Sequence, residues 1–600
     1  MLNTHSDRID YRELLSPPRG YKTSFILGTT YSLDLEALTA VCAIVGLNID
    51  PDSEIIQSPM HMLEALRRAS EKLIIFCQGG QIKVPEKSNR VLSLLENCVC
   101  EVNLKSKKSF HPKCWFVKYE NKNRDVKYKM IVLSRNMTFD RSWDVAAYLE
   151  SADKKEDVLG YNTATKDSIR SFLIWLSSQI KGSNQKVVLL KKKENVRKLG
   201  DALLGIEWKS LGKAYTSFDF LPYGIGENPN TELFDTFHEL FIISPFLSKS
   251  IIETFGKKRL SNADCTLITR KSELPKLNKE ILELFSTYTV KDEVVDGEEY
   301  ISEGEVAKTQ DIHAKVYLRT KYPDSALYIG SANASMSAFD GNVECMLVLY
   351  GKRRYLNVES LAKGLFGNDN KDNFYEDKSN PFKYIPPQDY TFDTGDEVSQ
   401  KLEQAVKDYC AISKKATIRN EYDIHINSKS FVSDTEIFIS PFMMKHIKQP
   451  IKDKMVFTGL KLIDLSEWYI VTAQQGGARI SRVIKIITDG IPIDERDSAV
   501  FASILGETKD KNAFLNYIAF LLSDDFLLAY LESLKKGKDS FNFFSLNYDT
   551  PILYERMLKA VASSPDCLRE IKDVIRLAGE DVVPNDFKKL YEQFEKVVNV

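Results

Sequence analysis

The chain has 600 residues, of which 43% are hydrophobic and 28% are charged, and its formal net charge is −2. This length is too great for one hydrophobic core and predicts three or four domains, while the composition excludes a disordered or fibrous protein. The near-neutral charge excludes a protein that is basic over its whole surface, so any affinity for nucleic acid must come from local basic patches.

The N-terminal segment is polar and lacks the apolar core of a signal peptide. The longest apolar run near it, 37–47, is too short to span a bilayer. Nine cysteines are scattered, and the closest pair, Cys98 and Cys100, lacks the spacing of a zinc site. We therefore expect a cytoplasmic protein in a reducing compartment, without a membrane contact, a metal or a cofactor.

The first third of the chain has the pattern of an α/β half-domain. Apolar runs predict strands over 25–31 and 72–77, and helical periodicity predicts helices over 33–45, 60–68 and 165–180. Together these elements predict a half-domain over 20–185. A strand is predicted over 187–190, and the basic run 191–198 favours a solvated helix start over a nucleic-acid groove.

The second third repeats this order of elements. Strands predicted over 240–246 and 265–269 precede His313 much as the strands over 25–31 and 72–77 precede His111. This is a weak internal repeat of about two hundred residues, and it predicts a second half-domain over 215–365.

The remaining chain has a different pattern. Residues 366–400 have a linker composition, a helix is predicted over 397–409, and alternation predicts strands over 422–426, 435–440, 468–472 and 482–487. These elements predict a β-rich accessory domain over 401–492. The run 436–442 is similar to 240–246, which leaves a third, decayed copy of the repeat open. Helical periodicity predicts an α-helical domain over 493–600, which packs on the β-rich region or recruits a partner.

Two copies of one polar pattern carry the chemistry. His111 and Lys113, and again His313 and Lys315, are one residue apart on a strand, so both side chains of a pair leave the same face. A second strand then ends in Ser134-Arg135-Asn136 or Ser331-Ala332-Asn333, and a carboxylate follows, Asp144 or Glu344. One such pattern is common in ordinary strands. Two copies in similar surroundings indicate a site.

These motifs resemble the two half-sites of the phospholipase D superfamily, and the resemblance covers about residues 20–350. It implies an α/β fold with two half-domains in a pseudo-twofold arrangement, followed by the β-rich and α-helical regions. It also implies that one histidine attacks phosphorus, that the other acts as acid and then base, and that lysines and asparagines hold phosphate oxygens. The implied catalytic residues are His111, Lys113, Asn136, His313, Lys315 and Asn333, with Ser134 and Ser331 as secondary donors and Glu344 and Asp144 orienting the histidines.

The sequence departs from the family pattern in two ways. The aspartate expected seven residues after each histidine is replaced by Lys118 and Thr320, and the histidine-to-asparagine spacings of 25 and 20 residues are longer than usual. The missing aspartate also occurs in the tyrosyl-DNA phosphodiesterase branch. The departure therefore favours a nuclease over a lipid enzyme.

Basic residues surround the first motif. Residues 104–129 hold nine lysines or arginines against two acids. These cations either cover a solvated hairpin or contact phosphates beside His111, and the sequence leaves both interpretations open. The predicted nucleic-acid-binding residues are Lys105, Lys107, Lys108, Arg135 and Arg141.

The resulting prediction is a metal-independent phosphodiesterase with a covalent phosphohistidine intermediate. DNA is the favoured substrate over RNA, in restriction or phage defence, with His111 as the nucleophile and His313 as the acid and base. The alternatives are a phospholipid-processing enzyme and a phosphate-gripping binding or scaffold protein. A protein partner such as a helicase, or a homodimer, is possible through the C-terminal region.

Overall fold

The computed structural model describes most of the chain up to residue 507 and short pieces beyond it. The described residues are 7, 9–47, 59–86, 89–104, 108–139, 142–154, 156–161, 163–181, 187–290, 311–366, 381–391, 397–507, 514–515, 518, 522, 554–555, 557–558, 571–572, 574–576 and 583–598. The predictions for Lys105, Lys107 and Arg141, and for much of 366–400 and 508–582, lie outside them.

The first half-domain is built on a six-stranded mixed sheet. Its strands lie in the order β4 (Val99–Val102), β2 (Leu73–Gln78), β1 (Tyr21–Thr30), β5 (Cys114–Asn121), β6 (Val126–Leu133) and β8 (Ala146–Glu150). Strand β1 is parallel to β2 and antiparallel to β5. The carboxyl ends of β1 and β2 therefore lie at the same edge of the sheet as the start of β5, where His111 and Lys113 precede it.

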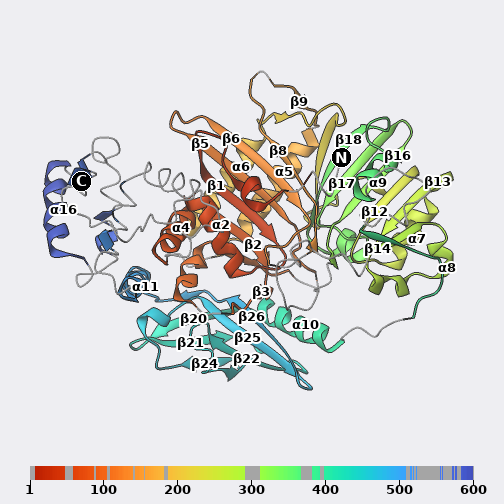
Figure 1. Ribbon diagram of the computed structural model, residues 1–600. Helices are drawn as coiled ribbons and strands as arrows, with labels where there is room; N and C mark the ends of the chain where they lie inside the picture. Colours follow the sequence, from red (N-terminus) through yellow and green to blue (C-terminus); the bar gives the residue numbers. More distant parts are fainter. Residues whose placement is uncertain are drawn as a thin grey trace, which may run out of the picture.

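The second half-domain has an eight-stranded sheet. Its order is β11 (Ser217–Tyr223), β18 (Glu344–Lys352), β17 (Asp324–Gly330), β16 (Val316–Lys321), β12 (Phe237–Ile243), β13 (Arg259–Ile268), β14 (Ser286–Val290) and β19 (Phe382–Ile385). The central six strands, read from β14 to β18, repeat the order and directions of the first sheet. The predicted repeat and its pseudo-twofold arrangement are confirmed (Figure 1).

The two sheets pack face to face. Alternate residues of a central strand point to opposite faces, so that Phe241 and Ile243 of β12 enter the core between the sheets, whereas Leu240 and Ile242 face the outer layer. Burial on both faces explains why these strands are nearly continuous apolar runs. The helices α5 (Thr163–Gln179), α6 (Val187–Leu203) and α9 (Val358–Phe366) contribute to the same central core.

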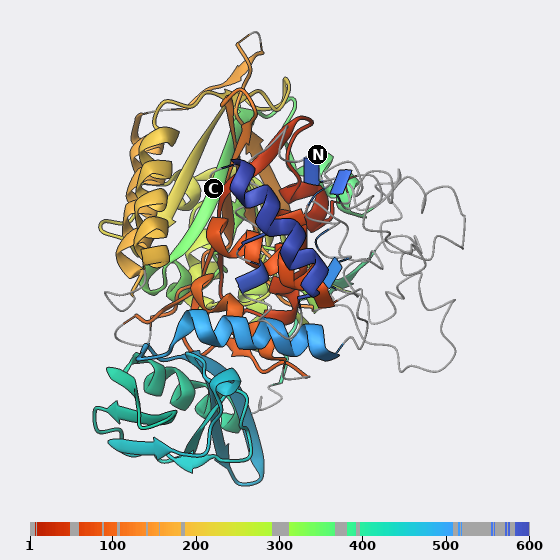
Figure 2. The ribbon, with the colours of Figure 1, turned by 90° about the vertical axis from the view of Figure 1, so that its left-hand side faces the viewer.

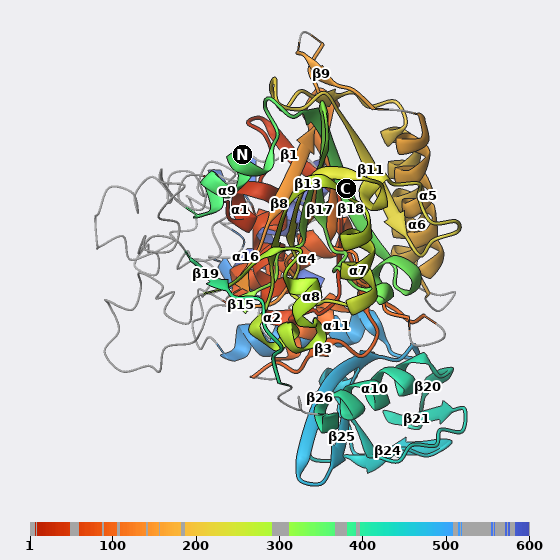
Figure 3. The same ribbon diagram turned by 90° about the vertical axis from the view of Figure 1, so that its right-hand side faces the viewer.

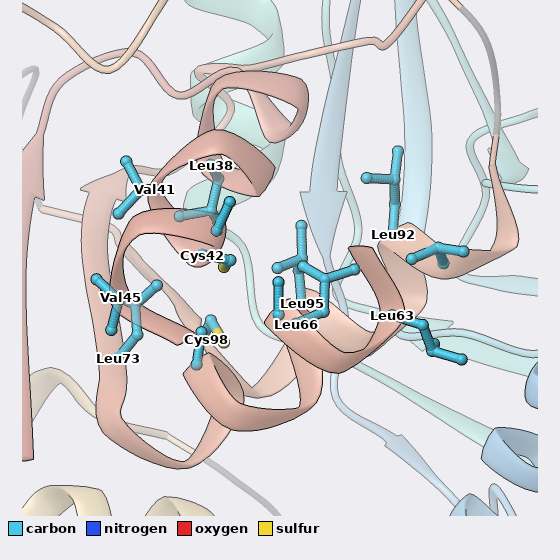
Figure 4. Close-up of a cluster of buried hydrophobic side chains, with 14 of the residues drawn as sticks. Leu38, Val41, Cys42, Val45, Leu63, Leu66, Leu73, Leu92, Leu95 and Cys98 are labelled. Carbon is cyan, nitrogen blue, oxygen red and sulfur yellow. The ribbon is translucent and has the colours of Figure 1, made fainter. Parts of the chain in front are cut away.

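Helices cover the outer face of each sheet. The first sheet is covered by α2 (Leu35–Leu47), α4 (Pro59–Lys72) and a 3-10 helix (Arg90–Asn97), whose leucines and valines interlock as Figure 4 shows, and the short α1 (Tyr11–Leu15) adds to this core. The second sheet is covered by α7 (Lys249–Lys257) and α8 (Lys279–Leu282), seen from their side in Figure 3. The two half-domains therefore form four layers in the order helix, sheet, sheet, helix.

The strand predicted over 187–190 is wrong, because these residues begin α6. Leu189, Val196 and Leu199 are buried at helical spacing, whereas Val187 and Leu190 are exposed. The basic run is helical, as predicted, but it lies inside this helix and not at its start. One of its members, Lys192, is fully buried and its ammonium donates to the carbonyls of Leu73 and Asn97 at 2.8 and 2.6 Å.

The accessory module begins with α10 (Glu397–Ala411), close to its predicted position, and contains two small sheets. One has the order β24 (Lys454–Phe457), β21 (Asp423–Ser428), β20 (Lys414–Arg419) and β27 (Thr488–Asp489). The other has the order β23 (Gln449–Pro450), β22 (Glu436–Pro441), β25 (Trp468–Gln475), β26 (Ala478–Lys485) and β3 (Ile82–Lys83).

Two further pairs complete the strands, β7 (Ser142–Trp143) with β15 (Asp311–Ile312), and β9 (Val158–Leu159) with β10 (Trp208–Lys209). Strand β22, which resembles β12 in sequence, has only antiparallel neighbours, whereas β12 has the parallel neighbour β13. The described part of the module is therefore not a third copy. The predicted linker 366–400 contributes one strand, β19, to the edge of the second sheet.

Helices α11 (Ile493–Glu507) and α16 (Asn585–Val598) confirm the predicted helical character of the C-terminal region. Phe501 of α11, Phe587 of α16 and the intervening Phe514 belong to the same buried cluster as α2 and α4. Figure 2 shows α11 between the accessory module and the first half-domain, with α16 beside the latter. Among the described helices, none combines the length and apolarity required to span a membrane.

Candidate active site

Both His-x-Lys motifs lie where the two half-domains meet. Phe110, directly before His111, forms a parallel bridge with Val343 of the second half-domain. Ile312, directly before His313, pairs in parallel with Trp143 of the first half-domain. Each histidine is thus placed by backbone hydrogen bonds to the other half: the His111 amide donates to the Val343 carbonyl at 2.9 Å, and the His313 amide donates to the Trp143 carbonyl at 3.0 Å.

The orienting carboxylates are exchanged between the halves. Glu344 lies on the second sheet, but its Oε2 is 2.8 Å from Nδ1 of His111. Asp144 lies in the first half-domain, and its Oδ1 is 3.2 Å from Nδ1 of His313. A carboxylate that accepts from Nδ1–H fixes the tautomer of a neutral imidazole, so that the lone pair is on Nε2. Each half-site is therefore incomplete without the other.

The two motif serines hold these carboxylates. Ser134 donates to Asp144 at 2.8 Å, and Ser331 donates to Glu344 at 2.5 Å. Each hydroxyl also accepts from the backbone amide that follows its carboxylate, Val145 or Cys345. Both serines are fully buried. This geometry favours a role in positioning the carboxylates over the direct phosphate contact expected from the sequence.

The loop glycine before Ser331 serves strand packing. A Cβ added to Gly330 would lie 2.2 Å from the carbonyl oxygen of Cys345 on the neighbouring strand. The contact with β18 explains the glycine, and the first half has Leu133 at the corresponding place.

The two motif lysines are fully buried between the histidines and carboxylates. The Lys113 ammonium lies 3.0 Å from Nε2 of His111, and the Lys315 ammonium donates to the His313 carbonyl at 2.5 Å. Burial lowers the pKa of Lys113 to about 8, although Glu344 opposes this effect. Burial, followed by the charge of Lys113, also lowers the pKa of Lys315. Because the two ammonium groups are already desolvated, a phosphate anion that reaches them interacts strongly with their charges.

The histidines are neutral over a wide pH range. Burial lowers the pKa of His111 to about 4, and the neighbouring lysines act in the same direction while Glu344 opposes them. Burial, together with Lys315, lowers the pKa of His313 to about 3. The pKa of Asp144 is also lowered: its burial raises it, but hydrogen bonds from His313, Ser142 and Ser134 outweigh that effect.

These pKa values predict an acid-sensitive fold. A histidine with a folded-state pKa below its ordinary value of 6.5 stabilises the native state above pH 6.5, and this contribution is lost as the pH falls toward 4. Between pH 6.5 and 5, each histidine is expected to account for a loss of about 1–2 kcal/mol of unfolding free energy. Urea denaturation at several pH values, compared with His111→Asn and His313→Asn, measures this. An equal pH dependence in all three proteins would contradict the assignment.

The two asparagines lie at corresponding strand ends. Asn136 Oδ1 accepts from the Ser32 amide at 3.5 Å. Asn333 is 9% exposed, and its Oδ1 is buried without a hydrogen-bond partner. A buried amide oxygen without a partner is costly, and a bound phosphate's hydrogen-bonded neighbours could offset that cost only if the amide is reached by the substrate. Both asparagines remain predicted phosphate-binding residues.

The structure adds two positioning residues that the sequence analysis did not single out. Gln78 is the last residue of β2, and its Oε1 accepts from the Phe110 amide at 2.6 Å. Arg270 occupies the equivalent place in the second half, and its guanidinium donates to the Ile312 carbonyl at 3.1 and 3.2 Å. Both hold the residue before a histidine. The two residues occupy equivalent positions in the internal repeat, because Gln78 comes two residues after Phe76 of β2 and Arg270 comes two residues after Ile268 of β13. The repeat could therefore have pointed to both.

The predicted basic surface is only partly described. Lys108 is exposed close to His111, and Arg135 lies 3.6 Å from Asp144 and also donates to the Thr138 carbonyl. The hairpin β5–β6 runs away from the site, so its turn lies roughly 25 Å from His111. Its cations Lys127 and Lys129 form ion pairs with acids at 2.9 Å. This favours the solvated interpretation for the outer hairpin.

Within the described part of the chain, no cluster of three or more histidine, cysteine, aspartate or glutamate side chains is arranged to hold a metal ion. The sequence prediction of no metal and no cofactor remains a prediction.

Comparisons with known proteins found similarity in the second half-domain and in the fold. Residues 233–364 match a family model described as "Cardiolipin synthase, PLD-like domain". A comparison with curated proteins found no match. Among solved structures, yeast tyrosyl-DNA phosphodiesterase is similar, with 14% identity over 58% of this chain and 87% of that chain and a TM-score of 0.34. Polyphosphate kinase from Porphyromonas gingivalis is 11% identical over 56% of this chain and 41% of its own, with a TM-score of 0.28.

Proposed function

We propose that this chain, whose residues 233–364 match a phospholipase D-like domain model, is a phosphodiesterase that cleaves nucleic acid, DNA above all, through a covalent phosphohistidine. One observation carries the proposal: His111 and His313 meet at the interface of the half-domains, each with a carboxylate from the other half. Two imidazoles with lone pairs on Nε2, beside two buried lysines, provide a nucleophile, an acid and base, and a cradle for phosphate oxygens.

The reaction proceeds in two displacements. In the first, the Nε2 lone pair of His111 attacks phosphorus, the bond from phosphorus to the leaving oxygen breaks, and Nε2–H of His313 protonates that oxygen. His313 must therefore be protonated in the substrate complex, and the substrate's negative charge raises its pKa. In the second, neutral His313 removes a proton from water, the water oxygen attacks phosphorus, and the phosphorus–nitrogen bond breaks to release His111.

The surroundings of the site favour nucleic acid as the substrate. Phe246, in the loop after β12, is 42% exposed, and the Arg270 guanidinium lies 4.5 Å from its ring centroid. Exposed Lys108 and partly exposed Arg135 lie at the first half-site. Aromatic side chains next to cations are the combination that binds single-stranded nucleic acid, by stacking on bases and by contact with phosphates. A role in restriction or phage defence stays a prediction from the sequence resemblance.

A nuclease assay in EDTA tests the proposal. The wild-type protein is expected to cleave single- or double-stranded DNA or RNA in EDTA, and His111→Ala and His313→Ala are each expected to lose cleavage. Abolition by EDTA, or normal cleavage by both variants, contradicts the mechanism. Hydrolysis of phosphatidylcholine vesicles without any cleavage of nucleic acid would instead show that the substrate is a phospholipid.

A further inference from the structure

The accessory module is built into the first half-domain. Strand β3, from the first half-domain, pairs with β26 of the module as the edge of its five-stranded sheet. The Trp468 indole donates to the Leu92 carbonyl at 3.1 Å, and Arg496 forms an ion pair with Glu96 at 3.0 Å with both side chains buried. Strand pairing, apolar burial and buried polar contacts together hold the module in one orientation relative to His111.

One partly buried carboxylate joins the module to the turn after β2. Glu101 accepts from the Gly80 amide at 3.0 Å and from the Lys485 amide of the module at 2.6 Å. Gly80 has a φ of +72°, and a Cβ there would lie 3.0 Å from Cys410 and 3.2 Å from Val406, both on α10. The turn is therefore closely packed against α10. The same turn follows Gln78, which holds the residue before His111.

Helix α10 brings a lysine to the first half-site. The Lys407 ammonium lies 5.0 Å from the ring centroid of Tyr31, and that ring meets the His111 ring edge-on at 5.1 Å between centroids. The ammonium is thus at most about 10 Å from the His111 ring. Lys407 and Tyr31 are both partly exposed. A cation held over an aromatic face keeps its charge available to a second, anionic partner.

We propose that Lys407 is a substrate-binding residue of the nuclease, which contacts the backbone phosphate next to the scissile one on the His111 side. This role rests on the proposed function and extends it: the accessory module forms one wall of the substrate path, and the preferred substrate is a strand with at least one phosphate beyond the one cleaved. The position within about 10 Å of His111 is about one nucleotide from the scissile phosphate.

Charge reversal at Lys407 tests this role. Binding of a short single-stranded oligonucleotide to wild type, Lys407→Glu and Lys407→Gln is measured by fluorescence anisotropy at several salt concentrations. Lys407→Glu is expected to weaken binding about tenfold at low salt, and both variants to reduce the slope of log affinity against log salt by about one. Hydrolysis of a dinucleotide, which has only the scissile phosphate, is expected to change by less than about twofold.

Lys401→Glu is the matched control, because it makes the same charge change on an exposed residue of the same helix. Its effect on oligonucleotide binding is expected to stay below about twofold. Equal effects of Lys401→Glu and Lys407→Glu, or an unchanged salt slope in the Lys407 variants, overturn the role of Lys407 while leaving the nuclease proposal intact. A wild-type protein that neither binds nor cleaves oligonucleotides overturns both.

Discussion

His313→Asn is expected to stop the reaction at a phosphorylated His111 when the substrate carries a good leaving group. A p-nitrophenyl ester of a nucleotide leaves without protonation, so the attack by His111 proceeds and gives one burst of p-nitrophenolate per site. The second displacement needs His313 as a base, and steady-state turnover is therefore expected to fall about 10²–10⁴-fold. Rapid-quench kinetics and detection of an acid-labile phosphoprotein measure the two steps.

The matched variant is His111→Asn, which removes the nucleophile and is expected to eliminate both the burst and the phosphoprotein. A burst in His111→Asn and none in His313→Asn would exchange the two roles. The absence of any phosphoprotein in either variant, with cleavage intact in wild type, would point to direct attack by water. Equal melting temperatures of the two variants at pH 7.5 exclude a difference in folding as the cause.

Removal of an orienting carboxylate is expected to impair the histidine of the opposite half. Glu344→Gln should reproduce the defect of His111→Asn, because Glu344 Oε2 lies 2.8 Å from Nδ1 of His111 although the two residues belong to different half-domains. Asp144→Asn should reproduce the defect of His313→Asn, including its burst with the p-nitrophenyl substrate. An amide in place of an orienting carboxylate is expected to lower turnover about 10²–10⁴-fold.

The comparison between variants is the test of this exchange. If Glu344 served His313 and Asp144 served His111, the two phenotypes would be reversed, whichever histidine attacks. Ser331→Ala and Ser134→Ala are milder companions, because each removes one hydrogen bond to the corresponding carboxylate. Each serine variant is expected to slow the same step as the variant of the carboxylate that it contacts, but by a smaller factor.

Local patterns singled out two His-x-Lys motifs that the fold brings to one interface, because the relative positions of these side chains follow from short spacings. A His-x-Lys pair on a strand has both side chains on one face whatever surrounds it, and two copies on matching elements indicated two half-sites. The repeat also predicted a second half-domain with the same order of elements along the chain. The accessory strands near Tyr422, Thr435 and Trp468 were found from alternation.

Other features depended on contacts that sequence patterns do not record. The run at 187–190 looked like a strand because it is apolar. At the start of α6, however, Val187 and Leu190 are exposed, whereas Leu189 and Val196 are buried at helical spacing. The motif serines looked like phosphate donors because their hydroxyls follow a strand end. Their partners are the carboxylates, whose distance from each serine is fixed only in the folded sheet.

The His-x-Lys pairs and the asparagines could be singled out from the sequence, because each group of residues lies within a few positions on one strand or turn. Only the tertiary structure decided which residues complete each half-site. Parallel pairing of Phe110 with Val343 and of Ile312 with Trp143 gives each histidine the other half's carboxylate, over separations of 233 and 169 residues. The packing of α10 likewise brings Lys407 beside Tyr31. Such contacts form when segments distant in the sequence pack against one another, so they cannot be predicted from the spacing of residues within one segment.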